Sequence, residues 1–214
     1  MSNTFKNNEG KPILMAMVKA IQDNKAYLGE IDGLIGDGDH GMNMNKGFST
    51  FESRNKDKEF SFTDGLDELG TILLTEIGGS MGPIYGTILM EMAEAGSGKE
   101  EVGITDFALM TAAGLNGLSD IVEAKVGDKT LVDTLVPAVA SLNKSVEENV
   151  DFKAALAEMK KAAEAGKEST KELVAKYGRS SRLGERSKGV LDAGAISCYI
   201  LLAAMADSIT ELLQ

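Results

Sequence analysis

Apolar residues recur at steps of three and four along most of the chain, a spacing that places them on one face of a helix. The first such face begins at Ile13 and continues to Ile21. The clearest runs from Phe152 to Tyr177, where steps of four and three alternate. We expect this long helix to pack along an antiparallel neighbour. Runs that alternate strictly between apolar and polar residues, as strands do, are almost absent.

Residues typical of helix ends frame several of these segments. The apolar set from Leu66 to Ile77 lies between a cap at Ser61 and a stop at Gly78. A segment over residues 83–95 begins with proline, which the first helical turn tolerates, and is followed by glycine. Pro137 lies inside another segment, and we expect it to bend or shorten that helix. Further helices are expected over residues 42–54, 104–121, 130–146 and 193–212.

These patterns predict about eight helices, so the expected fold class is all-α. The chain has 214 residues, the length of one ordinary domain. No repeat or low-complexity linker divides it, so we expect residues 1–214 to form a single domain in which the polar residues 1–10 are a flexible N-terminus. The longest apolar stretch, 195–206, is shorter than the roughly 20 residues of a membrane span, which favours a buried helix.

The charge balance narrows the range of partners. Lys and Arg total 22 and Asp and Glu total 33, so the formal net charge is −11. Nucleic acids and anionic membrane surfaces attract basic proteins, so we expect neither as a partner. An acidic protein that holds an anion needs a metal ion or backbone N–H groups to do so. The single cysteine, Cys198, cannot form an intramolecular disulfide, and no signal peptide is seen, so we expect a cytoplasmic protein.

The segment over residues 31–43 has the composition of a metal site. It combines three carboxylates, the only histidine and an asparagine with closely spaced glycines: Asp32, Asp37, Asp39, His40 and Asn43. Like charges this close repel one another unless a cation lies among them, and Mg²⁺ commonly uses one or two carboxylates together with substrate phosphates. The alternative is an Asp/Gly turn whose side chains cap a helix. The pattern favours a metal site, and an EF-hand is excluded because its spaced ligands are missing.

Two further loops suit anion binding. Residues 78–83 form a glycine-rich turn before a helix, where backbone N–H groups and the helix dipole attract anions, although a plain C-cap followed by an N-cap fits equally well. Residues 178–189 hold three Arg and a Lys, which match phosphate oxygens, and the alternative is a surface loop paired to nearby acids. Residues 127–130 are either a further contact or only a helix cap.

Taken together, these loops resemble the nucleotide-binding L subunit of dihydroxyacetone kinase. The resemblance implies an antiparallel eight-helix barrel that binds a nucleotide, ADP or ATP, and two Mg²⁺ at one rim. The matching segments, in family order, are GLIGDGDHGMNMNKGF (33–48), GGSMGPIYGT (78–87), GDKTLVDTLVP (127–137), and GRSSRLGERSKG with DAG (178–194).

The resemblance also implies roles for individual residues. It makes Asp32, Asp37 and Asp39 the Mg²⁺ ligands. The residues that it places at the nucleotide are His40, Gly41, Met42, Asn43, Gly79, Ser80, Met81, Leu131, Arg179, Asp192, Ala193 and Gly194.

The function that the resemblance implies is phosphoryl transfer to a small hydroxyketone, a triose or tetrose, held by a separate K-type subunit. The short chain favours ADP as a bound coenzyme, rephosphorylated by a phosphohistidine protein of the phosphotransferase system. The alternatives are exchanging ATP, or a nucleotide-binding regulatory subunit without turnover. The regulatory alternative rests on departures from the family pattern at Met81, normally a serine, and around Val122 and Val190. Formation of a homodimer is left open.

Overall fold

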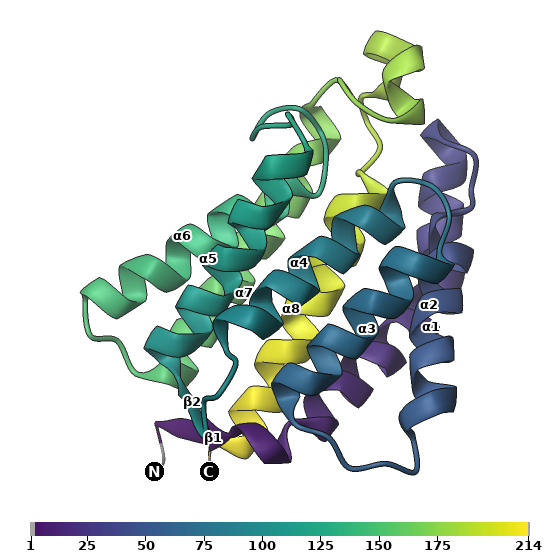
Figure 1. The fold of residues 1–214 in the computed structure, drawn as a ribbon. Helices are drawn as coiled ribbons and strands as arrows, with labels where there is room; N and C mark the ends of the chain where they lie inside the picture. The colour runs from purple at the N-terminus through teal and green to yellow at the C-terminus, as the bar shows by residue number, and fades with distance from the viewer. Residues whose placement is uncertain (1–2, 214) are drawn as a thin grey trace.

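The computed structural model of the chain describes residues 3–213, and these contain eight α-helices (Figure 1). The all-α prediction is confirmed. The helices are α1 (Lys11–Ile35), α2 (His40–Asn55), α3 (Phe62–Glu76), α4 (Met81–Ala95), α5 (Ile104–Ile121), α6 (Val132–Glu147), α7 (Phe152–Ser169) and α8 (Ala193–Leu212). Shorter elements are the strands β1 (Thr4–Lys6) and β2 (Glu101–Gly103) and the 3₁₀ helices η1 (Asn7–Glu9), η2 (Thr170–Glu172) and η3 (Arg179–Ser187).

The helices close into a ring. Each α-helix packs against the next one along the chain, and α8 packs against α1. Consecutive helices run antiparallel, as Figure 1 shows. The α1–α2, α3–α4, α5–α6 and α7–α8 connections therefore meet at one end of the barrel, which we call the upper rim. The remaining connections lie at the other end, the lower rim, together with both ends of the chain (Figure 1).

The apolar helix faces meet inside this ring. Ile13, Met17 and Ile21 of the first predicted face are fully buried, and burying each such side chain stabilises the fold by about 1.5–3 kcal/mol. Helix α8 is long and apolar enough to cross a membrane, but 61% of its most apolar window is buried inside the structure. It therefore has the character of a core helix of a soluble protein, as the sequence predicted.

In place of the expected tail, the described part of residues 1–10 forms regular elements, β1 and η1. Strand β1 pairs antiparallel with β2, with Thr4 opposite Gly103. The buried Asn7 side chain donates to Thr63 Oγ1 at 3.0 Å, and the Phe5 ring packs edge-on against another core ring. Strands of three residues are too short to produce a recognisable alternating pattern, which is why the sequence did not reveal them.

Two predictions about helix lengths also need correction. The helix predicted from Phe152 to Tyr177 ends at Ser169. Its apolar spacing continues, but the Thr170 hydroxyl accepts a hydrogen bond from the Asp192 backbone N–H at 3.0 Å, and this tertiary contact diverts the chain. Pro137, where we expect a bend or a shortened helix, does not shorten α6, which continues past this proline to Glu147.

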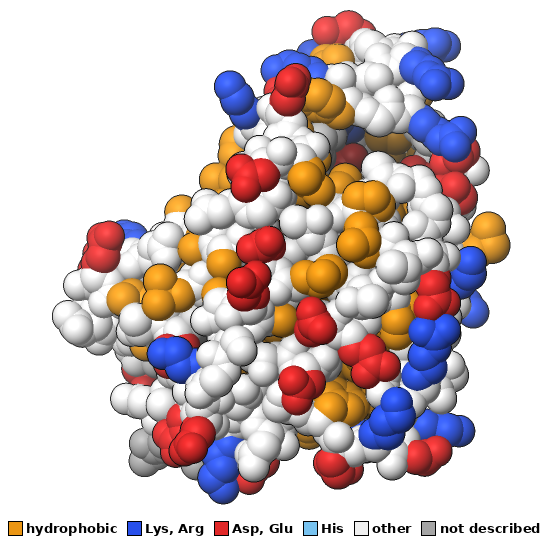
Figure 2. Space-filling model, in the orientation of Figure 1, with side chains coloured by type: hydrophobic (Ala, Val, Ile, Leu, Met, Phe, Trp, Pro, Cys, Tyr) orange, Lys and Arg blue, Asp and Glu red, His pale blue; other side chains and the backbone are white. Residues whose placement is uncertain are grey.

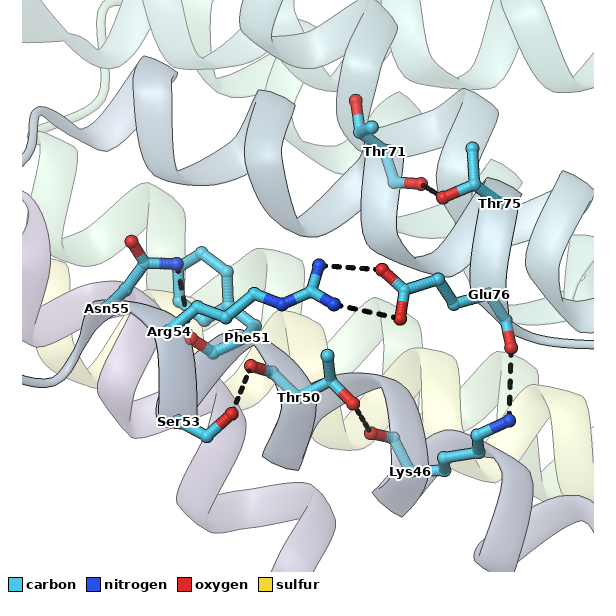
Figure 3. Close-up of polar contacts among 9 residues, drawn as sticks. All are labelled: Lys46, Thr50, Phe51, Ser53, Arg54, Asn55, Thr71, Thr75 and Glu76. Atoms are coloured by element: carbon cyan, nitrogen blue, oxygen red, sulfur yellow. Dashed lines mark hydrogen bonds and ion pairs between the residues drawn. The ribbon is translucent and has the colours of Figure 1, made fainter.

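Polar side chains fix the end of α3 against α2, next to the upper rim (Figure 3). The Arg54 guanidinium makes two hydrogen bonds with the Glu76 carboxylate, at 2.6 and 3.1 Å. The Lys46 ammonium donates to the Glu76 carbonyl oxygen at 3.2 Å. Exposed ion pairs of this kind contribute about 0–1 kcal/mol. Their larger consequence is positional, because the glycine-rich connection at Gly78 leaves from this turn.

Candidate functional site

A cavity of about 400 Å³ opens at the upper rim. Its volume falls within the range of small-molecule sites, roughly 300–1,000 Å³. All four connections of this rim contribute to its lining, as do the first turns of α2, α4, α6 and α8. Figure 2 shows a hollow between the body of the protein and the lobe formed by η3, on which Lys and Arg side chains gather.

Glycines bring the three aspartates of the α1–α2 connection together. The connection folds back onto α1, and a Cβ atom at Gly29 would lie only 3.3 Å from the Gly38 carbonyl oxygen. Gly38 itself has a φ of +77°, a conformation that glycine adopts without a steric penalty. The fold-back places Asp37 and Asp39 beside Asp32, in the last turn of α1. One carboxylate oxygen from each of the three lies within 4.8 Å of the other two.

The electrostatics of this cluster suit a cation. The pKa of the Asp39 carboxyl is raised, first by burial and then by the negative charges of Asp37 and Asp32. The Arg179 guanidinium lies 2.8 Å from Asp37 Oδ2 and supplies part of the missing positive charge. Three carboxylates offer the hard oxygen donors that Mg²⁺ requires. The donor set therefore fits Mg²⁺ better than it fits a plain turn.

The capping alternative can be examined directly at Asp39. This residue is the N-cap of α2, but its side chain makes no capping hydrogen bond. Asp32 instead reaches across, and its Oδ2 accepts from the His40 backbone N–H at 3.3 Å. The Asp39 carboxylate makes a hydrogen bond with the Asn43 side chain instead, and it faces the carboxylates of Asp37 and Asp32.

Four helix N-termini point toward the cavity, because α2, α4, α6 and α8 all begin at the upper rim. The N-cap residues of α4 and α6, Ser80 and Leu131, also lack a capping side-chain hydrogen bond. In α8 the Asp192 carboxylate accepts from the Ala195 N–H at 2.8 Å. Free N–H groups and the positive end of the dipole, equivalent to about half a charge, attract anions. The cavity of this acidic protein therefore offers positive potential from its backbone.

A hydrogen-bonded chain crosses the barrel beneath the cavity. His40 Nε2 lies 2.8 Å from Ser197 Oγ, and the Tyr85 hydroxyl lies 2.6 Å from the same Ser197 oxygen. Burial lowers the pKa of His40 to about 4, although the nearby Asp39 charge opposes this shift. His40 is consequently neutral at neutral pH, and it links α2 to α8 and α4.

Most of the residues predicted for the site line this cavity. They are Asp32, Asp37, Asp39, His40, Asn43, Gly79, Ser80, Met81, Leu131, Arg179, Asp192, Ala193 and Gly194. Gly41 and Met42 do not. Gly41 is buried where α2 meets α1, and a Cβ atom there would collide with the Lys25 carbonyl oxygen. Met42 points away from the core with 68% of its surface exposed.

Several lining residues have no role assigned from the sequence, among them Tyr85 and Tyr177. The apolar pattern that begins at Phe152 ends at Tyr177, but it marks this residue only as part of a helix face. The sequence favours residues 127–130 as either a further contact or only a helix cap, and the structure places Lys129 and Thr130 of this segment in the lining of the cavity. Asp133 accepts from the Gly127 N–H at 2.6 Å and from the Thr130 N–H at 2.8 Å, while Thr130 lines the cavity.

Comparison with known proteins identifies the family. The sequence profile described as the DAK2 domain matches residues 34–207. The chain belongs to the DAK2 domain family. This membership confirms the resemblance drawn from the four motifs, and with it the prediction of an enzyme subunit of the dihydroxyacetone kinase type.

Relatives of this DAK2 domain include full-length subunits and longer kinases. The ADP-binding subunit DhaL of the PEP-dependent dihydroxyacetone kinase of Escherichia coli is 37% identical over 183 residues, covering 84% of this chain and 86% of that protein. The DhaL subunit of the PTS-dependent enzyme of Lactococcus lactis is 36% identical, covering 86% of this chain and 88% of that protein. A D-erythrulose kinase of Mycolicibacterium smegmatis is 29% identical, and the alignment covers 91% of this chain but 34% of that kinase.

A solved structure with the same fold is the dihydroxyacetone kinase of C. freundii in complex with AMP-PNP and Mg²⁺. It superposes on this DAK2 domain with a TM-score of 0.67 at 22% sequence identity. The match covers 92% of this chain and 33% of that longer chain. At this identity the likeness establishes the barrel fold alone.

Proposed function

We propose that the chain is the nucleotide- and Mg²⁺-binding subunit of a dihydroxyacetone-type kinase, which transfers a phosphoryl group to a small hydroxyketone held by a separate K-type subunit. The observation that carries this proposal is the cluster of Asp32, Asp37 and Asp39, whose oxygens lie within 4.8 Å of one another beside a cavity edged by helix N-termini. The names of the DhaL relatives support the same function.

Each wall of the cavity has a distinct part in this function. The three aspartates would hold Mg²⁺, which when bound supplies positive charge to the transferring phosphoryl group. Backbone N–H groups at Gly79 and Ser80 bind phosphate oxygens, and the open space around Gly79 lets a phosphate approach them. The buried side chain of Leu131 offers an apolar surface to the adenine. Phosphoryl transfer depends mainly on such positioning and charge stabilisation.

Arg179 completes the phosphate side of the site. Its guanidinium contacts Asp37 in this structure, and it can turn to a phosphate oxygen when nucleotide enters, because its side chain is 64% exposed. Arginine keeps its charge and forms paired hydrogen bonds with phosphate. Truncation of Arg179 should therefore weaken the binding of nucleotide phosphates.

Within this proposal, ADP is a bound coenzyme that a phosphohistidine protein of the phosphotransferase system rephosphorylates. The similarity to the ADP-binding DhaL subunits, which the alignments cover over 86% and 88% of their length, supports this assignment. Native mass spectrometry of gently purified protein tests it. Bound ADP is the expected result. An empty site that binds ATP and ADP equally weakly would contradict the proposal that ADP is a bound coenzyme.

A reconstitution assay tests the kinase assignment itself. The purified chain alone should not phosphorylate dihydroxyacetone with any phospho-donor, whereas mixing with a K-type subunit and the phosphohistidine protein should start turnover. Turnover by the isolated chain would reject the two-subunit arrangement. Nucleotide binding without turnover in the complete mixture would favour a regulatory subunit, for which the replacement of a family serine by Met81 is the supporting feature.

The second candidate is an ATP-exchanging subunit that acts on a tetrose. The similarity to a D-erythrulose kinase favours it. The same reconstitution with ATP in place of the phosphohistidine protein, and with dihydroxyacetone and erythrulose compared as acceptors, separates the two candidates.

A further inference from the structure

Lys129 is a buried cation that the proposed chemistry leaves without a role. It lies in the α5–α6 connection with only 1% of its surface exposed, and its φ of +61° places a non-glycine residue in the left-handed region. Burial lowers the pKa of its ammonium group, although the charges of Asp192, Asp133 and Glu172 oppose this shift. Lysine is almost never fully buried unless its ammonium group is paired, so its partners indicate its role.

The partners of Lys129 are two backbone carbonyl groups that lie far away in the sequence. Its Nζ donates to the carbonyl oxygens of Thr170 and Val190. These two residues are the flanks of the long α7–α8 connection, residues 171–189, which we call the arginine loop because it carries Arg179. A single ammonium group therefore joins the two ends of this loop.

Other contacts close the same neck. The Gly189 N–H donates to the Lys171 carbonyl oxygen at 2.8 Å, and the Asp192 N–H donates to Thr170 Oγ1 at 3.0 Å. The two ends of the arginine loop are thus held together by hydrogen bonds. Its middle part reaches the cavity, where Gly178, Arg179 and Ser180 contribute to the lining. A long loop without such closure would sample many positions for its tip.

The residue before Lys129 ties the arginine loop to the same connection. The Lys176 N–H donates to the Asp128 carbonyl oxygen at 3.1 Å, and Lys176 Nζ lies 2.5 Å from Asp128 Oδ1. The α5–α6 connection, which also carries the lining residue Leu131, is therefore the platform on which the arginine loop rests. Leu131 and the arginine loop therefore share this support.

We propose that Lys129 is a positioning residue: by clamping the neck of the arginine loop to the α5–α6 connection, it aligns Arg179 and Asp192 with Leu131. This inference rests on the proposed nucleotide binding for its ligand, but the clamp itself is a property of the protein without ligand. Lys129 acts through these residues and need not touch the nucleotide.

The first test measures the clamp without nucleotide, by hydrogen–deuterium exchange. In the wild-type protein the amides of Lys176 and Gly189 should exchange more slowly than those at the tip near Arg182. In Lys129→Met, which keeps the length but cannot donate, exchange throughout residues 171–189 should become faster. The matched control is Lys171→Met, an exposed lysine in the same segment, which should leave exchange unchanged. Unprotected Lys176 and Gly189 amides in the wild type would overturn the proposal even if no variant folds.

The second test is a double-mutant cycle for ADP affinity with Lys129→Met and Arg179→Ala. We expect Lys129→Met to raise the Kd for ADP by roughly tenfold, as removal of a residue that orients ligand contacts typically does. In the Arg179→Ala background, Lys129→Met should raise the Kd for ADP by a clearly smaller factor, because the effects of substitutions at coupled residues are not additive. Lys129→Gln, which retains two N–H donors, should recover part of the affinity.

The outcomes separate this inference from the proposed function. If the wild-type protein does not bind ADP, the proposed function fails while the exchange experiment still decides the clamp. If the wild type binds ADP and Lys129→Met loses affinity equally with and without Arg179, then Lys129 does not act through the arginine loop. A lower melting temperature with unchanged ADP affinity would show a purely structural lysine and would likewise overturn the proposal.

Discussion

The two rims of the barrel differ in how the backbone N–H groups at the starts of their helices are satisfied. At the lower rim, side chains complete the helix starts: Ser61 Oγ accepts from the Asp64 N–H at 3.1 Å, and Asp151 accepts from the Lys153 N–H at 3.0 Å. At the upper rim, the N-cap side chains of α2, α4 and α6 form no such hydrogen bond. Two helices depart from this contrast: Asp192 caps α8 at the upper rim, and α1 at the lower rim begins at Gly10 without a side-chain cap. The starts of α2, α4 and α6 are therefore the ones that remain for a ligand.

The backbone differs between the rims in the same sense. Several left-handed residues cluster at the upper rim, among them Gly38, Gly79 and Gly127, whereas Gly98 and Asn149 are examples from the lower rim. Glycine adopts this conformation without a steric penalty. The non-glycine cases among the described residues are Lys129 at the upper rim and Asn149 at the lower rim, so the upper rim is richer in flexible glycine turns rather than in strain.

The largest expected effect comes from a glycine that belongs to packing rather than to the site. Gly41→Ala should lower the free energy of unfolding without ligand by about 3 kcal/mol or more, because its methyl group would collide with the Lys25 carbonyl oxygen of α1. Met42→Ala, one residue away but exposed, should change stability by less than about 0.5 kcal/mol. Urea denaturation of both variants is the measurement. A stable Gly41→Ala protein that has lost ADP affinity would restore Gly41 to the nucleotide site.

The next effect concerns pH and His40, in the absence of metal. Because its folded pKa is about 4 and its usual value is 6.5, the unfolded chain takes up a proton first as pH falls. The contribution of His40 to the free energy of unfolding is therefore complete above pH 6.5 and is lost as the pH falls toward 4. The loss is about 3 kcal/mol in total, of which about 2 kcal/mol has occurred by pH 5.

Asp192 opposes this loss in the wild type. Burial raises its pKa to about 6, so the folded protein binds this proton more readily and gains relative stability as pH falls through 6. The two contributions separate in His40→Gln, which removes the titrating ring. Between pH 7 and pH 5, the free energy of unfolding of this variant should rise by about 2 kcal/mol relative to that of the wild type, as measured in denaturant titrations. Parallel pH dependences for the two proteins would contradict a buried neutral His40.

The fold could be predicted because helix periodicity is repeated over many residues, and α5 and α8 match their predicted bounds of 104–121 and 193–212. Failures occur where tertiary contacts override local pattern. The apolar spacing after Ser169 is still helical, yet the chain tightens into the 3₁₀ helix η2 at Thr170, which the Asp192 N–H and the Lys129 ammonium contact, and it becomes extended at Leu173. Neither contact can be inferred from the neighbouring sequence.

The site residues, like the helices, include some that the local sequence reveals and others that only tertiary contacts reveal. Asp32, Asp37 and Asp39 could be selected from the sequence because three carboxylates among glycines are unfavourable without a cation. Tyr85 and Lys129 could not, since their importance lies in partners more than 40 residues away in the chain, Ser197 and Val190 among them. A buried lysine looks like any surface lysine in a sequence of mixed charge.

The third prediction concerns the metal cluster. A ligand at 100 times its Kd stabilises a protein by about 2.7 kcal/mol. At about 2–4 °C per kcal/mol for a chain of this size, this corresponds to a rise in melting temperature of roughly 5–11 °C. Asp39→Asn should abolish the part of this shift that depends on Mg²⁺ when ADP and Mg²⁺ are added together. Without ligands the variant should melt at the same temperature or higher, because the pKa of Asp39 is raised by burial and by Asp37 and Asp32, and the change relieves that cost. An identical Mg²⁺ response in wild type and variant would refute the metal assignment.

The smallest effects test the contrast between the rims most directly. Ser61→Ala and Ser80→Ala remove the same hydroxyl from two N-cap positions, one at each rim. Ser61 caps α3, so its loss should lower the free energy of unfolding by about 1 kcal/mol. Ser80 makes no capping hydrogen bond, so without ligand its loss should change stability by less than about 0.5 kcal/mol. The order should reverse for ligand: Ser80→Ala weakens ADP binding measured by calorimetry, while Ser61→Ala leaves it intact. Equal losses of stability in the two variants would mean that Ser80 is an ordinary cap, and the upper rim would then differ from the lower one in its aspartates and arginine alone.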